Sequence, residues 1–239
     1  MNNLFDNFGR IQKNDPEFHE IFKNFAFNEV FEYSSLSEKD SILVILASLI
    51  AAQSPKAFKK ILISALDKDI TPEEVKEVLY QSVPYVGFAR AHNFFGVVIK
   101  VFDKKAIGQP LESRSNTDKD NRYEKGREIQ ESYFGKKNIE MMRNQTPNDQ
   151  KHFNTFLEGY CFGDFYTRDG LNDQQRELIT FTFIATLGGC ENQLRGHTQG
   201  NLAVGNTKEK LISAITVIMP YIGFPRTLNA LAIVNEICG

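Results

Sequence analysis

PYVGFARAHN at Pro84–Asn93 and PYIGFPRTLN at Pro220–Asn229 are the two stretches that decide the fold of this 239-residue chain. Six residues are identical in both and keep the same spacing: a proline, a tyrosine, a glycine, a phenylalanine, an arginine and an asparagine. Each stretch lies near the end of an apolar helical pattern. Their offset of 136 residues is far longer than the unit of a solenoid, so the chain is a tandem repeat of two small helical domains.

Four main helices are expected in each copy. Residues 36–52 are apolar nearly all round, which is typical of a helix buried on most sides. Helices at 54–66 and 71–83 begin with a capping residue and a proline, and a fourth follows at 89–102. The second copy repeats this order from Asn172 onward. No stretch alternates convincingly with period two, so the sequence predicts an all-α fold.

The domain boundaries follow from changes in composition along the chain. Residues 106–120 are polar and rich in turn-forming residues, as in a linker. We therefore expect an N-terminal helical domain at 1–105 and a C-terminal helical domain at 121–239.

Composition narrows the classes of function. A net charge of −2 and a pI near 6.1 give no positive surface for nucleic acid or an anionic membrane. The N-terminus lacks a signal pattern, and no window reaches the roughly 18 uninterrupted apolar residues of a membrane span. Cys161, Cys190 and Cys238 lack metal-ligand spacing and are expected to be free thiols. These features predict a cytoplasmic protein that binds a small molecule.

The side chains that could take part in catalysis are concentrated in the second copy. Glu177 lies near the start of a buried helix, and Cys190 and His197 follow at the next turn and helix. Cys190 and His197 are seven residues apart. If both are helical, they lie within about 20° of each other on one face of the helix, roughly two turns apart. The equivalent positions of the first copy hold neither an acid nor an imidazole. If there is a site, the second copy supplies its titrating groups.

The repeated Pro-Tyr-x-Gly-Phe element has a different interpretation. It occurs in both copies, including the copy that has no counterpart of His197. We therefore assign it to packing or to subunit contact rather than to chemistry.

Seven motifs occur in the second copy in a fixed order, and together they span nearly half of the chain. They are Arg122-Tyr-Glu-Lys-Gly126, Tyr160-Cys-Phe-Gly163, Arg168-x-Gly170-Leu171, Arg176-Glu177-Leu178, Leu187-Gly188, Gln193-Leu194-Arg195-x-His197 and Pro220-Tyr-x-Gly223. In this order residues 121–237 resemble the carboxymuconolactone decarboxylase family, and residues 30–102 resemble a degenerate second copy. The resemblance implies the all-helical alkylhydroperoxidase-D-like fold. It also implies a homotrimer that mimics the hexameric ring of single-copy members.

The resemblance implies two alternative chemistries. Members that resemble the alkylhydroperoxidase reductase subunit use a Cys-x-x-Cys pair, a histidine and a glutamate on the preceding helix. Here Cys190 matches the first cysteine, but Gln193 stands in place of the second. Thiol-disulfide exchange needs a resolving thiol within reach, and only Cys161 or Cys238 could supply it.

The lactone decarboxylase members keep the histidine without the cysteine pair, which is the pattern of this chain. By this resemblance His197 is the candidate proton donor, and Glu177 is its orienting partner. Arg168 or Arg195 is a candidate clamp for the substrate carboxylate, although Arg195 also has the spacing of a surface ion pair with Glu191. No metal or organic cofactor is implied.

A third hypothesis is a noncatalytic oligomeric binding protein that retains only the fold of the family. Three structural features distinguish the hypotheses. A pocket enclosing His197 and Glu177 favours the decarboxylase, a second sulfur near Cys190 favours the peroxidase, and the absence of both favours the binding protein.

Overall fold

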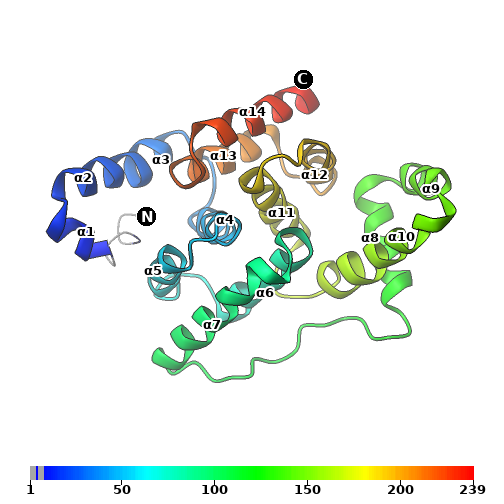
Figure 1. Ribbon diagram of the computed structural model, residues 1–239, viewed down its shortest axis with the longest axis horizontal. Coiled ribbons are helices and arrows are strands. Elements are labelled where there is room, and N and C mark those ends of the chain that lie inside the picture. Colours follow the sequence, from blue (N-terminus) through cyan, green and yellow to red (C-terminus); the bar gives the residue numbers. More distant parts are fainter. Residues whose placement is uncertain (1–3, 5–7) are drawn as a thin grey trace.

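The computed structural model describes residue 4 and residues 8–239, and in these parts the chain is built of helices (Figure 1). None of the described residues forms a β-strand, so the predicted all-α fold is confirmed. No helix within the described part is long and apolar enough to cross a membrane.

The helices fall into two sets, in which η2 and η4 are π-helical and η3 is a 3₁₀ turn. The first set is α1 (Gly9–Asn14), α2 (Pro16–Asn24), η2 (Phe25–Glu29), α3 (Val30–Glu32), α4 (Glu38–Ala51), α5 (Pro55–Ala65), α6 (Pro72–Val86) and α7 (Phe88–Lys104). The second is α8 (Arg122–Phe134), α9 (Lys136–Gln145), η3 (Asn148–Gln150), α10 (Lys151–Phe156), η4 (Leu157–Tyr166), α11 (Asp173–Leu187), α12 (Glu191–Ala203), α13 (Lys208–Ile222) and α14 (Phe224–Cys238).

The two sets are structural repeats. A shift of 136 residues carries the bounds of α6 onto those of α13, and it carries α4, α5 and α7 onto α11, α12 and α14 within a few residues. The same shift carries η2 into η4, so the π-helical turn is repeated as well. The offset measured in the sequence therefore relates the elements from η2 to α7 to those from η4 to α14.

Several helix starts have the capping groups that the sequence predicts. The side chains of Ser37, Thr71, Asn172 and Thr207 each accept a hydrogen bond from a backbone N–H in the first turn of α4, α6, α11 and α13. In α6 and α11 the third helical residue also bonds back to the cap, which completes a capping box. These local signals fix where the four central helices begin.

The two repeats share one hydrophobic core. Helix α11 packs against α4 and α6 of the first repeat, and α13 packs against α4. The fully buried side chains of Ile45, Phe181, Phe183 and Val217 belong to a single cluster that draws on both repeats. The chain boundary between the repeats is therefore not a boundary between two cores.

The segment between α7 and α8 is an extended strap along the lower edge of Figure 1, and hydrogen bonds attach it to the second repeat. The side chain of Asn116 donates to the carbonyl of Thr167 over 2.9 Å, and the hydroxyl of Thr117 donates to the carbonyl of Gly163 over 2.9 Å. The strap holds the end of η4 in place.

The N-terminal segments of the two repeats, α1–α3 and α8–α10, lie on opposite sides of the central helices (Figure 1). Each segment contacts the helix of the other repeat that contains the Pro-Tyr element, which is α6 in the first repeat and α13 in the second. Helix α3 and η2 contact α13, and η4 contacts α6. The tyrosine of one repeat thereby faces the N-terminal segment of the other.

Helix α8 and η4 touch through their backbones. A Cβ atom added at Gly126 would collide with the carbonyl oxygen of Glu158, and one added at Gly163 would collide with that of Arg122. Glycine is required at both positions because the two helices approach too closely for any side chain. This contact fixes the wall of the cavity described next.

Candidate active site

A cavity of about 620 Å³ lies between the segment α8–η4 and helices α6, α11 and α12. Its walls are mostly apolar and aromatic, and Phe134, Met142, Phe156 and Ile184 are among the lining residues. His197 also faces the cavity. A concave, largely apolar site with a few polar groups is the usual form of a small-molecule site.

Glu177 and His197 form a buried pair behind the cavity wall. Nδ1 of His197 lies 3.0 Å from Oε2 and 3.2 Å from Oε1 of Glu177, whose side chain is fully buried. Because an ionised carboxylate only accepts hydrogen bonds, we assign a proton to Nδ1. Nε2 is then the nitrogen that can exchange a proton with a ligand.

Helices α11 and α12 are joined tightly enough to hold this pair in position. The side chain of Asn201 donates to the carbonyls of Glu177 and His197, over 3.0 and 2.7 Å. A Cβ atom at Gly200 would lie 2.5 Å from Oε2 of Glu177, so the glycine makes room for the carboxylate. The site is built into the packing of the two helices.

Two tyrosines close a ring of hydrogen bonds around the pair. The hydroxyl of Tyr166 donates to Oε1 of Glu177 over 2.8 Å and lies 2.7 Å from the hydroxyl of Tyr85. The Tyr85 hydroxyl lies 3.4 Å from Nε2 of His197. All four contacts are satisfied together when both nitrogens of His197 donate and Tyr85 donates to Tyr166. The ring thus accommodates a doubly protonated imidazole.

Burial controls the protonation of both tyrosines. Loss of water contact is the largest cause that raises the pKa of Tyr85 well above its usual value, and the same holds for the pKa of Tyr166. The charge of Glu177 raises both pKa values further. Each hydroxyl therefore keeps its proton at neutral pH and acts as a neutral hydrogen-bond donor.

Tyr85 belongs to the first repeat, and buried polar groups on its helix connect it to the second. Nη2 of Arg176 lies 3.2 Å from Oε2 of Glu77, and Nη1 lies 3.2 Å from Oε1 of Gln81. Gln81 in turn donates to the hydroxyl of Thr180 over 3.2 Å. These bonds tie α6 to α11 and fix the position from which Tyr85 reaches His197.

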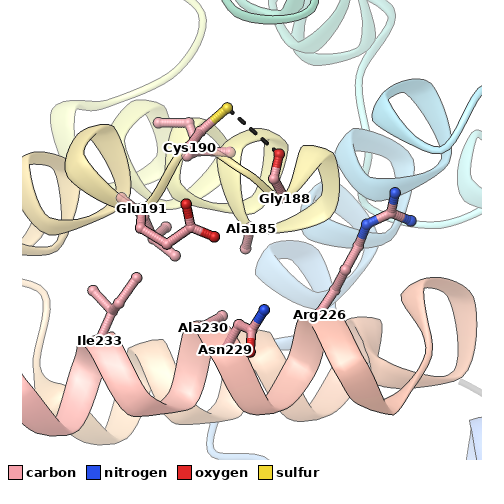
Figure 2. A pocket seen from close by; sticks show the side chains of 10 residues that line it. Ala185, Gly188, Cys190, Glu191, Arg226, Asn229, Ala230 and Ile233 are labelled. Carbon is pink, nitrogen blue, oxygen red and sulfur yellow. Dashed lines mark hydrogen bonds between the residues drawn. The ribbon is translucent and has the colours of Figure 1, made fainter.

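Two cysteines line the same cavity. Cys190 precedes α12, where its sulfur contacts the carbonyl oxygen of Gly188 over 3.6 Å (Figure 2). Cys161 lies on η4, and its thiol contacts the Tyr85 hydroxyl over 3.7 Å. Burial raises the pKa of Cys161 to about 12, so its thiol stays protonated at neutral pH. Cys238 is not among the lining residues.

The two arginines expected to clamp a substrate carboxylate do not line this cavity. Arg168 makes a bidentate ion pair with the buried carboxylate of Glu77, with distances of 3.0 and 3.1 Å. Arg195 pairs with Glu236 on the surface at 2.8 and 2.9 Å, rather than with Glu191. Both guanidinium groups already have carboxylate partners elsewhere.

The structure also places one residue of the Pro-Tyr element, which the sequence assigned to packing or subunit contact, beside the candidate pair. Tyr85 lines the cavity and contacts His197. Its counterpart in the second repeat is Tyr221, and the residue of the first repeat that is equivalent to His197 is Ile61. Tyr166 was missed as well. No spacing in the sequence identifies these two tyrosines, because their role depends on how one repeat packs against the other.

These features define an all-helical tandem-repeat protein with a carboxylate-histidine pair beside an apolar cavity. The model of the carboxymuconolactone decarboxylase family matches residues 16–100 and 152–236, which lie 136 residues apart. The chain belongs to this family.

Two relatives illustrate the likeness. A 4-carboxymuconolactone decarboxylase from Acinetobacter baylyi (strain ATCC 33305 / BD413 / ADP1) is 27% identical over 116 residues, which are 48% of this chain and 86% of that protein. The crystal structure of a candidate gamma-carboxymuconolactone decarboxylase subunit from Burkholderia xenovorans LB400 superposes with a TM-score of 0.53 at 18% identity. That match covers 97% of this chain and 90% of the other, and it supports the fold.

Proposed function

We propose that the protein decarboxylates a carboxylated unsaturated lactone without a cofactor, and that His197 is the proton donor. The observation that carries this proposal is the His197–Glu177 pair, whose imidazole faces a cavity of about 620 Å³ while the carboxylate is fully buried behind it. The family membership and the decarboxylase relative support the same class of reaction.

The reaction has two steps. In the first, the bond between the ring carbon and its carboxylate breaks, carbon dioxide leaves, and the electron pair is delocalised into the ring carbonyl as a dienolate. In the second, Nε2 of His197 gives its proton to a ring carbon and completes the product. His197 then takes a proton from solvent, so each turnover consumes one proton and releases one carbon dioxide.

The surroundings of His197 suit both steps. A carboxylate held against apolar walls loses its hydration, which favours its conversion to neutral carbon dioxide. The hydrogen bond between Nδ1 and Glu177 orients the ring so that Nε2, which carries the proton transferred in the second step, is available to the substrate. We assign the neutral Tyr85 hydroxyl, 3.4 Å from Nε2, as the donor to the negative charge that develops on the ring oxygen, a role in which it turns its proton from Tyr166 to the substrate.

The test is a decarboxylation assay on 4-carboxymuconolactone, with loss of the lactone followed by absorbance and carbon dioxide measured separately. His197→Ala is expected to lower kcat by roughly 10²–10⁴-fold, the usual contribution of a positioned acid. His92→Ala is the matched control, because His92 is exposed on α7 and does not line the cavity. Equal rates for the parent and His197→Ala would contradict the acid role.

Thiol chemistry is the alternative that one observation favours, since Cys190 and Cys161 line the same cavity. The raised pKa of Cys161 weighs against it, because a protonated thiol is a poor nucleophile. Cys190→Ser separates the two functions. The decarboxylase proposal predicts unchanged lactone turnover in this variant, whereas a thiol peroxidase would lose all peroxide consumption.

A further inference from the structure

The charge of the cavity points to the class of substrate. Among the described residues that line it, none is a lysine or an arginine, and His197 is the one lining side chain that can carry a positive charge. Its charge already faces the carboxylate of Glu177 over 3.0 Å. A substrate carboxylate can share the His197 cation before it leaves as carbon dioxide. A second carboxylate would find no cation of its own and only neutral polar groups, such as the amides of Gln130, Asn138 and Gln193.

The shape of the cavity points in the same direction. At about 620 Å³ it falls in the range of roughly 300–1,000 Å³ that is typical of sites for drug-sized ligands. It extends from His197 to the side chains of Phe153 and Phe156, which are 64% and 59% exposed although they line the cavity. These two rings form an aromatic mouth. The outer end of a ligand is therefore in contact with apolar surface.

Most of the other lining residues are also apolar. Phe134 packs edge-on against the His197 ring at a centroid distance of 5.5 Å, and Met142 and Leu157 line the same cavity. Methionine and aromatic side chains of this kind accommodate rings and branched chains.

We propose that the natural substrate carries a single carboxylate, the one lost as carbon dioxide, together with a bulky apolar substituent. That substituent is an aryl ring or a branched alkyl chain that lies against Phe134, Met142 and Phe156. This inference rests on the proposed decarboxylation and specifies its substrate class. It distinguishes the site from one built for 4-carboxymuconolactone, which carries two carboxylates on a small ring.

Two matched lactones test the proposal. One is 4-carboxymuconolactone, and the other has the same ring and ring carboxylate but a phenyl group in place of the side-chain carboxylate. The parent enzyme is expected to show kcat/KM for the phenyl analogue at least about tenfold above that for the dicarboxylate. Binding of both compounds to His197→Ala, measured by calorimetry, reports affinity without turnover.

Two variants probe the wall, and a third is their control. Phe156→Ala should lower kcat/KM for the phenyl analogue by roughly tenfold and that for the dicarboxylate by less, so the ratio of the two kcat/KM values falls. Phe224→Ala is the control, because Phe224 is also 59% exposed but does not line the cavity. Met142→Arg places a cation in the cavity and should shift the preference toward the dicarboxylate.

The outcomes separate this inference from the proposed function. If both lactones are turned over in a His197-dependent way but the dicarboxylate is preferred, the substrate class is wrong and the decarboxylase proposal stands. If neither lactone reacts, but the phenyl analogue binds more tightly and Phe156→Ala weakens that binding, the reaction is wrong and the apolar ligand class stands. If neither compound binds or reacts, both proposals fail.

Discussion

In the proposed mechanism Glu177 is the residue on which the site depends most, because its buried carboxylate contacts both His197 and Tyr166. Glu177→Gln keeps the shape of the side chain but replaces the carboxylate that accepts the hydrogen bond from Nδ1 of His197. We expect kcat for lactone decarboxylation to fall about 100-fold or more, with a small change in KM. A variant that melts like the parent yet retains full kcat would remove Glu177 from the mechanism.

Cys161 gives a second prediction at the residue scale. Burial raises its pKa from 9.0 to about 12, and alkylation requires the thiolate. The rate of alkylation of Cys161 by iodoacetamide should therefore keep rising with pH beyond 9, where an ordinary thiol levels off. Mass spectrometry of the native protein at pH 8 should find Cys190 and Cys238 modified well before Cys161. Modification of all three at similar rates would show that Cys161 is accessible and easily ionised.

The sequence predicted the titrating pair but not the groups that surround it. His197 and Glu177 were found because both lie in short motifs that resemble the family. Tyr85 and Tyr166 reach the pair from helices that are distant in sequence, and nothing local in the sequence encodes that contact. The arginines were misplaced for the same reason, since the ion pairs with Glu77 and Glu236 are formed across the fold.

The contact between α8 and η4 is the element on which the cavity wall depends. Gly126→Ala would force a Cβ into the carbonyl of Glu158, and we expect a loss of stability of about 1–3 kcal/mol. Gly96→Ala is the matched control, because Gly96 is also inside a helix and has open space beside it. It should stabilise by roughly 0.5–1 kcal/mol. Urea unfolding measures both, and equal effects would contradict the close approach.

Elements differ in how far the sequence predicts them. The starts of α6 and α11 were predicted correctly because their caps are local signals. The π-helical turn η4 was not predicted, since π-helical hydrogen bonding has no simple sequence signal. The site residues Cys161 and Tyr166 lie on this element, which is one reason why their placement could not be inferred.

At the scale of the whole molecule, the shared core makes each repeat dependent on the other. A fragment of residues 121–239 would expose the faces of α11 and α13 that pack against α4. We expect this fragment alone to lack cooperative unfolding, and coexpression with residues 1–120 to restore it. Circular dichroism and calorimetry measure both. A fragment that is monomeric and unfolds cooperatively by itself would show that the second repeat is an independent domain.

The central claim is that a tyrosine of one repeat completes the catalytic pair of the other, and the two equivalent tyrosines test it most directly. Tyr85 contacts His197, whereas Tyr221 is its repeat counterpart and its buried hydroxyl has no hydrogen-bond partner among the described residues. The measurement is kcat for lactone decarboxylation by Tyr85→Phe and Tyr221→Phe. We predict a loss of roughly tenfold or more for Tyr85→Phe and no loss for Tyr221→Phe. Equal rates in the two variants would contradict a site shared between the repeats.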